Sequence, residues 1–198
     1  MTDMKQHKLN KALLDAAWAS DVKKARALVG KGAKTDATND LGDQPLHLAA
    51  IRGCKEMAEI LIAAGAKIDA MDDDGWQPLH FAAVSGHKDL VEFLVVRGSN
   101  IEAAGNWNRT PLHCAAANGR LEVVEMLLGM GAKIDAADRD GNRPLHKAIE
   151  NRHGKVVELL KRAENDPELH EKRRREAMAE HLARQRKFGS LRPKGPSL

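Results

Sequence analysis

The hydrophobic residues of the chain fall into pairs of short helical patterns separated by turns that are rich in glycine and aspartate. In one such unit Pro78 occupies the first position of a helix, where its missing N–H costs nothing, and this helix stops at Gly86. A second pattern over residues 90–95 has Leu and Val at helical spacing, and Gly98 ends it as a left-handed residue. The turn Asp72–Gly75 precedes the pair and reverses the chain. The pattern therefore predicts a turn followed by two short helices.

This unit recurs along the chain with a period of 33 residues. The tripeptide Pro-Leu-His occurs four times at that spacing, and glycines in the turns and after the helices keep the same phase. No unit can bury its own apolar face, so neighbouring units must stack. The tripeptides are formed by Pro45, Leu46, His47, Pro78, Leu79, His80, Pro111, Leu112, His113, Pro144, Leu145 and His146.

The repeated unit resembles the ankyrin repeat. The run Asp-x-x-Gly-x-x-Pro-Leu-His-x-Ala-Ala-x-x-Gly, followed by a Val/Leu helix and Gly-Ala, matches that family over residues 38–136. The resemblance implies an all-α solenoid of helix-turn-helix units with short β-turn fingers, in which each motif histidine bridges its repeat to the next by hydrogen bonds. Extending the phase predicts a repeat domain over residues 1–163, with repeats at about 5–37, 38–70, 71–103, 104–136 and 137–163.

Some positions depart from the family pattern. The pattern has Thr before Pro-Leu-His, where its hydroxyl can cap the helix and bond the histidine, and only Thr110 keeps it. Gln44, Gln77 and Arg143 take its place, and a poor cap costs about 0.5–2 kcal/mol. Asn108 replaces a turn glycine, which the left-handed region tolerates in Asn. The last repeat carries several polar substitutions, so we expect it to be the frailest.

The composition agrees with a stack of thin helix contacts. Only three Trp, three Phe and no Tyr occur in 198 residues, although 42% of the residues are hydrophobic. Aliphatic and Ala-rich layers suit short stacked helices, whereas a β-sandwich or barrel favours aromatic and β-branched residues. Phe81 and Phe93 are expected to be packing residues.

A concave surface is the expected binding face, because in ankyrin-like stacks the finger tips and the first helices line it. All three Trp fall on this face, and Trp and Arg are enriched at interface hot spots. Two alternatives remain open: Trp76 packs on Arg109 of the next turn, and Trp18 covers the exposed end of the stack. The predicted partner-binding residues are Leu41, Asp43, Asp74, Trp76, Trp107, Arg109, Asp140 and Asn142 in the fingers, and Trp18, Ile51, Arg52, Val84, Ser85, Ala117 and Asn118 in the first helices.

Nothing in the sequence favours catalysis. Cys54 and Cys114 form no CxxC or zinc spacing, and Cys114 has no identifiable base partner, so it is expected to be a small buried residue. No phosphate-binding loop or HExxH motif occurs. We expect no metal and no cofactor, no membrane span, a monomer, and a reduced cytoplasmic setting. The expected function is a non-catalytic adaptor or scaffold that binds a partner protein on the concave face.

The tail after residue 163 is more basic than the body of the chain, with nine Lys and Arg against six acidic residues. Residues 164–188 are predicted to be helical from Asp166 onward, and residues 189–198 to be flexible. Contact with nucleic acid, an acidic partner or an anionic membrane surface would suit this tail, as would nuclear import in a eukaryotic host. The alternative is a solvated helix, because acids interleave the first basic cluster. The alternative function is thus a nucleic-acid-associated regulatory protein. The basic residues concerned are Lys172, Arg173, Arg174, Arg175, Arg184, Arg186 and Lys187.

Overall fold

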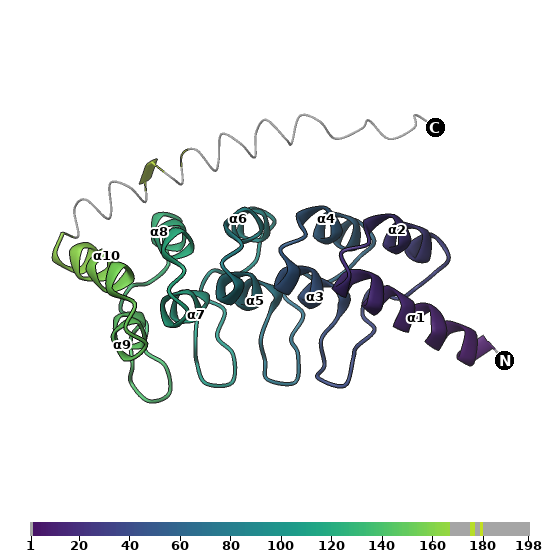
Figure 1. The fold of residues 1–198 in the computed structure, drawn as a ribbon, viewed down its shortest axis with the longest axis horizontal. Coiled ribbons are helices and arrows are strands. Elements are labelled where there is room, and N and C mark those ends of the chain that lie inside the picture. The colour runs from purple at the N-terminus through teal and green to yellow at the C-terminus, as the bar shows by residue number, and fades with distance from the viewer. Residues whose placement is uncertain (1, 167–174, 177–178, 180–198) are drawn as a thin grey trace.

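The computed structural model describes residues 2–166, 175–176 and 179. Within residues 2–166 the chain forms ten helices and no strand, arranged as five successive pairs (Figure 1). The expected all-α repeat solenoid is confirmed. The pairs are α1 Thr2–Trp18 with α2 Val22–Gly30, α3 Pro45–Arg52 with α4 Lys55–Ala63, α5 Pro78–Ser85 with α6 Lys88–Val96, α7 Pro111–Ala117 with α8 Leu121–Gly129, and α9 Pro144–Glu150 with α10 Gly154–Asn165.

The helices form two layers, with the odd-numbered helices side by side in one and the even-numbered helices in the other (Figure 1). Loops between the pairs project as four fingers from the odd-numbered layer: the first at 31–44, the second at 64–77, the third at 97–110 and the fourth at 130–143. Neighbouring fingers are joined by backbone hydrogen bonds. The N–H of Asn106 donates to the carbonyl of Asp74 over 3.1 Å, and that of Arg139 to the carbonyl of Trp107 over 3.0 Å. Each finger is thus held by the one before it.

Small and aliphatic side chains fill the space between the layers. Leu46, Leu79 and Leu112 are fully enclosed, one in each inner repeat, and the Ala pairs of the first helices are almost inaccessible to solvent. Phe93 is buried as expected, whereas Phe81 is only half-buried. The low aromatic content therefore agrees with a core filled mainly by Leu, Val and Ala.

Glycine is required after α3 and α5 for two reasons, the backbone conformation and the lack of space for a Cβ atom. Gly53 and Gly86 have φ of 68° and 85°, which L side chains rarely adopt. A Cβ on Gly53 would also overlap the ring of His87, which reaches back from the next repeat so that its Nε2 lies 3.0 Å from the carbonyl oxygen of Ile51. Arg120 crosses Gly86 in the same way.

This second row of bridging side chains was not predicted from the sequence. The row continues in His153, whose Nε2 lies 3.0 Å from the carbonyl oxygen of Ala117. The signal that could have revealed it is the 33-residue phase of positions 87, 120 and 153. Non-glycine residues with positive φ take the equivalent turn position at the two ends of the stack, Ser20 in the first pair and Arg152 in the last.

Candidate functional site

Three buried histidines fix the fingers to the helices behind them. Nδ1 of His47 accepts a hydrogen bond from the backbone N–H three residues earlier, over 2.9 Å. Its Nε2 lies 2.9 Å from the carbonyl oxygen of Ala70 and 3.2 Å from that of Trp76, both in the second finger. His80 and His113 make equivalent contacts to the third and fourth fingers. The bridging role expected for these three histidines is therefore found.

These contacts define the protonation state of the rings. Because Nδ1 accepts from a backbone N–H, the proton lies on Nε2, which donates to the carbonyls. Desolvation by burial lowers the pKa of His47, His80 and His113, although their carbonyl acceptors act in the opposite direction. The rings are thus neutral donors that hold the fingers in place.

The last motif histidine does not fulfil the expectation that each motif histidine bridges its repeat to the next. His146 is exposed, and its Nδ1 accepts from the N–H of Arg143 in its own repeat over 3.0 Å. The described chain has no fifth finger for its other nitrogen to reach, so it bridges nothing there. Thr110, by contrast, behaves as expected: its hydroxyl lies 2.9 Å from Nδ1 of His113 at the start of α7.

Side chains near the start of the first, second and fourth finger tips shape their turns, whereas the third finger has Gly105 at this position. Oδ1 of Asp72 accepts from the N–H of Asp74 over 3.0 Å and from that of Trp76 over 2.7 Å. Asn39 and Asp138 make the equivalent pair of bonds in the first and fourth fingers. The turns of these three fingers are therefore ordered by their own side chains before any partner is present.

A groove of about 760 Å³ lies between the first two fingers and helices α1, α3 and α5. Its floor is apolar, whereas the fingers give it an acidic wall. The apolar lining residues are Leu14, Trp18, Leu41, Leu48, Ile51 and Phe81. The carboxylates are those of Asp15, Asp40, Asp43, Asp72, Asp73 and Asp74, and no Lys, Arg or His lies among the lining residues that the structure describes.

The groove brings together five of the predicted partner-binding residues: Trp18, Leu41, Asp43, Ile51 and Asp74. The side chain of Asp43 is only 5% exposed and accepts a hydrogen bond from the amide of Asn39 over 3.0 Å, so it also supports the first finger. The other predicted residues lie outside the groove lining: Arg52, Trp76, Val84, Ser85, Trp107, Arg109, Ala117, Asn118, Asp140 and Asn142.

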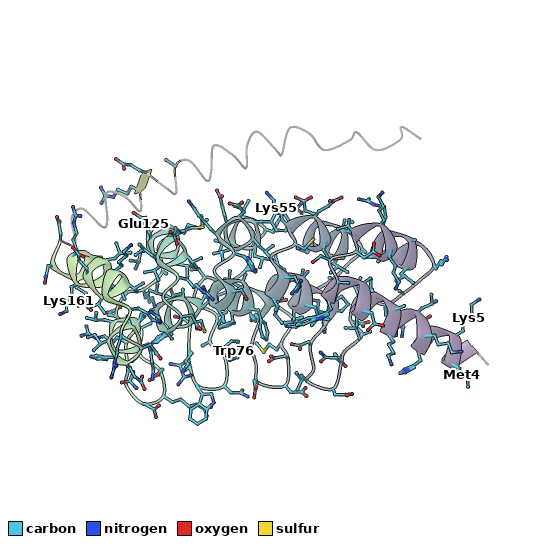
Figure 2. All side chains as sticks on the ribbon, in the orientation of Figure 1. Met4, Lys5, Lys55, Trp76, Glu125 and Lys161 are labelled. Carbon is cyan, nitrogen blue, oxygen red and sulfur yellow. The ribbon has the colours of Figure 1, made fainter. Side chains whose placement is uncertain are left out.

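The three tryptophans have different surroundings. Trp107 is 54% exposed, and Trp18 is 53% exposed, with the guanidinium of Arg52 5.5 Å from its ring centroid. Trp76, on the finger side of the molecule in Figure 2, is half-buried: its ring centroid lies 5.4 Å from that of Phe81, and its edge covers Gly105. Trp76 is therefore in part a packing residue, but against Phe81 and Gly105 and not on Arg109 as the alternative proposed, whereas Trp18 and Trp107 are open to solvent.

Several groove residues were missed by the sequence reasoning. It assigned Phe81 to packing, and of the finger acids in the groove it named only Asp43 and Asp74 as contacts, leaving out Asp40, Asp72 and Asp73. Leu48 and Phe81 stand at one phase of the repeat, directly after the motif histidine, and their common orientation could have been inferred from that spacing. Asp15 in α1 stands at the same phase, 33 residues before Leu48, so the same spacing could have placed it at the groove.

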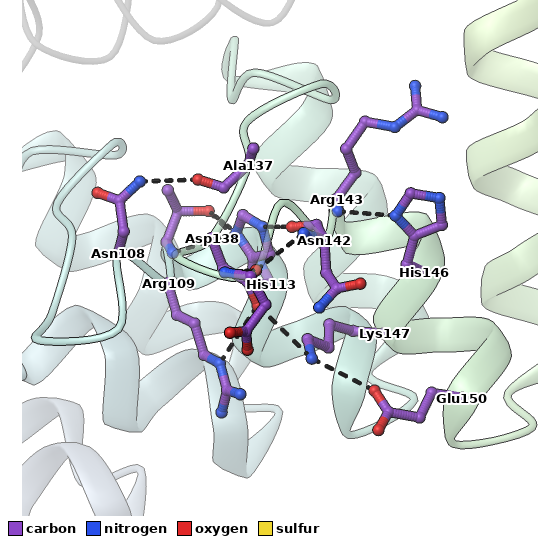
Figure 3. A network of polar contacts seen from close by, with 12 residues as sticks. Asn108, Arg109, His113, Ala137, Asp138, Asn142, Arg143, His146, Lys147 and Glu150 are labelled. Atoms are coloured by element: carbon purple, nitrogen blue, oxygen red, sulfur yellow. Dashed lines mark hydrogen bonds and ion pairs between the residues drawn. The ribbon is translucent and has the colours of Figure 1, made fainter.

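The fourth finger carries a polar network of a different kind (Figure 3). The carboxylate of Asp138 is 1% exposed and forms ion pairs with Arg109 over 3.7 Å and with Lys147 over 3.5 Å. Nζ of Lys147 also lies 3.3 Å from Oε2 of Glu150. Desolvation raises the pKa of Asp138, but the N–H donors of the finger and the nearby Lys147 outweigh it, so the pKa lies below the usual value. Arg109, a predicted partner contact, is thus engaged within the chain.

The comparison with known families agrees with this architecture. A family model described as ankyrin repeats in three copies matches residues 13–105 and 98–171, which is well over half of the chain. The chain belongs to the ankyrin repeat family. Ankyrin repeats are in general protein–protein interaction modules, and the family is typically non-catalytic. A search of curated proteins finds none that matches this ankyrin repeat protein.

Within the described residues, no group of three or more His, Cys, Asp or Glu side chains is placed to hold a metal ion. Cys114 is buried as expected, and burial raises the pKa of its thiol to about 12, so the reactive thiolate does not form near neutral pH. None of the described helices is both long and apolar enough to cross a membrane.

The basic tail of this ankyrin repeat protein falls mainly outside the described residues. Of its predicted contact residues only Arg175 is described, as an exposed position. The helix α10 continues to Asn165, and the N–H of Asp166 donates to the carbonyl of Arg162 at its end. The predictions for residues 164–188 and 189–198, including nucleic-acid contact, stay predictions.

Proposed function

We propose that this ankyrin repeat protein is a non-catalytic adaptor that binds a partner protein in the groove between its first two fingers. The observation that carries the proposal is the exposed apolar surface there. Leu41 is 69% exposed and Trp18 is 53% exposed, and both line the same groove as the half-buried Ile51. Apolar surface gathered in one place and edged by polar residues is typical of interaction sites.

The groove is rigid as well as apolar. Its fingers are ordered by the Asn39 and Asp72 turn bonds, and the bridge from His47 holds the second finger to α3. The binding surface is therefore preorganised, so that little conformational entropy is lost in the fingers when a partner binds. A fully buried tryptophan covers about 150–250 Å², and Trp18 is 53% exposed, so at about 25 cal/mol per Å² covering its exposed half gives an upper bound of roughly 2–3 kcal/mol.

The same proposal places this binding in the cytoplasm. Cys54 and Cys114 are free thiols, which suits a reducing compartment.

Affinity capture tests the proposal. The Trp18→Ala/Leu41→Ala variant is compared with wild type and with Met4→Ala/Ile149→Ala, a control that removes two exposed apolar side chains outside the groove lining. Captured proteins are identified by mass spectrometry, and thermal melting confirms that all three proteins are folded. We expect the groove variant to lose a partner that wild type and control retain. Retention of every partner by the groove variant would show that binding does not use this surface.

The finger tryptophans give a second arm of the same experiment. Trp107→Ala removes an exposed ring and should leave stability unchanged, so any lost partner reports a contact at the third finger. Trp76→Ala also removes packing against Phe81, and its result counts only if the melting temperature is preserved.

A further inference from the structure

The charge of the groove is opposite to that of the whole chain. The chain has a formal net charge of +4, yet six carboxylates and no basic side chain line the groove. None of the six forms an ion pair with a described residue. The groove therefore presents negative charge that the fold itself does not neutralise.

The six acids do not all serve the fold. Asp43 and Asp72 hold the fingers through hydrogen bonds, as described above. Asp15, Asp40, Asp73 and Asp74 are exposed, and none of their side chains forms a hydrogen bond or ion pair within the described structure. Four carboxylates are thus free to meet a ligand.

The apolar floor runs alongside this acidic wall. Trp18 and Ile51 come from consecutive first helices, and Leu41 closes the groove from the first finger. Acidic surface alone would suit many cations, but a ligand that fills the whole groove must carry apolar bulk on one side and positive charge on the other. Phosphate-bearing ligands such as nucleic acid or anionic lipid have the wrong charge for this wall.

We propose that the groove binds a basic peptide segment of a partner protein, with Lys or Arg side chains on Asp40, Asp73 and Asp74 and a bulky apolar side chain on the floor at Trp18 and Ile51. This rests on the proposed function and specifies the chemistry of its partner. Charge pairing of this kind speeds association and weakens as salt is added, because the Debye length falls from about 10 Å at 0.1 M to about 3 Å at 1 M.

A library of random 12-residue peptides displayed on phage tests the proposal against the full chain. Enriched peptides are synthesised, and their dissociation constants are measured at 50 and 500 mM NaCl. The test variant is Asp40→Asn/Asp73→Asn/Asp74→Asn. The matched control, Glu59→Gln/Glu122→Gln/Glu158→Gln, makes the same change in net charge at exposed positions of the even-numbered helix layer.

We expect the enriched peptides to combine Lys or Arg with Leu, Ile, Phe or Trp. Their affinity should fall at least tenfold in the Asp variant, less than twofold in the control, and at least tenfold between the two salt concentrations. The affinity of the peptides should also fall in the Trp18→Ala/Leu41→Ala variant.

Three outcomes would overturn the proposal, and they are distinguishable. Peptides without net positive charge that lose binding in Trp18→Ala/Leu41→Ala but not in the Asp variant would remove the basic partner and leave the proposed function standing. Peptides insensitive to both variants, or no enrichment, would count against both proposals. Tighter peptide binding after replacement of the basic residues of segment 172–187 by Ser would make the chain's own tail the occupant.

Discussion

The N-terminal and C-terminal halves of the concave face are built on the same repeat, yet their acids have opposite surroundings. In the second finger Asp73 and Asp74 are exposed at the groove and meet no described cation. In the fourth finger Asp138 is enclosed between Arg109 and Lys147. The groove acids of the first half remain available for a ligand, whereas Asp138 in the second half is paired within the chain.

The difference arises at equivalent positions of the repeat. Leu48 and Phe81 supply apolar floor in the second and third repeats, and 66 residues after Phe81 the same phase holds Lys147. The buried ammonium group of Lys147 needs a counter-charge, which Asp138 provides. One change from an apolar to a basic residue thus converts a potential binding surface into an internal ion pair without altering the backbone frame.

The largest expected effect comes from removing the charge of Asp138. Asp138→Asn preserves the finger turn, because Asn39 makes the same backbone bonds in the first finger, but leaves Lys147 buried beside only Glu150. We expect a loss of about 3–5 kcal/mol in the free energy of unfolding, measured by urea denaturation at pH 7. Asp73→Asn, which removes a carboxylate that is exposed at the groove, should cost less than about 0.5 kcal/mol.

The double variant Asp138→Asn/Lys147→Leu sharpens this comparison, since it rebuilds the Asn39 and Leu48 combination of the second repeat. It should recover most of the lost stability, because apolar replacement of a buried ion pair is often neutral. Equal costs for Asp138→Asn and Asp73→Asn would mean that the two halves do not differ in the way described.

A smaller loss in the free energy of unfolding is expected when an inner motif histidine is replaced, and almost none when the last one is. His80→Gln breaks the bridge to the third finger, whose carbonyls at Ala103 and Arg109 lose their donor, so we expect a cost of about 2 kcal/mol. His146→Gln changes an exposed ring and should cost less than about 0.5 kcal/mol. Urea midpoints of the two variants give the test, and a cost at His146 as large as that at His80 would contradict the bridging account.

The smallest effect is a dependence of stability on pH. The folded pKa values of His47, His80 and His113 lie below the ordinary value near 6.5, so the unfolded chain binds protons first as the pH falls. Their contribution is complete above pH 6.5 and declines below it. We expect the urea midpoint to fall between pH 7 and pH 5, and to fall less in His80→Gln. A midpoint that rises over this range would show that the rings are charged in the folded chain.

Much of the fold could be predicted from particular residues. Pro78 and Gly86 mark the bounds of α5, and the 33-residue phase assigns the same bounds to the other inner repeats. Burial of Phe93 and Cys114 followed from the same pattern. These features depend on backbone preferences and on local spacing, which a sequence displays directly.

Less of the candidate site than of the fold could be predicted from the sequence. Trp18, Leu41 and Ile51 were placed on the binding face by phase, but Phe81 was assigned to packing and Asp73 to an ordinary turn. The pairing of Lys147 with Asp138 was not foreseen either, because it depends on how far a side chain reaches between a helix and the finger before it.

The sequence by itself determined the repeat, its helices and the order in which they stack, because each unit carries its own turn residues and an apolar face that only a neighbour can cover. Only the tertiary structure decided which charges are free. Asp15, Asp40 and Asp73 are far apart along the chain and line one groove, while Asp138, of the same residue type, is enclosed. Stacking places side chains of different repeats within reach of one another, and whether a cation stands among them depends on that placement.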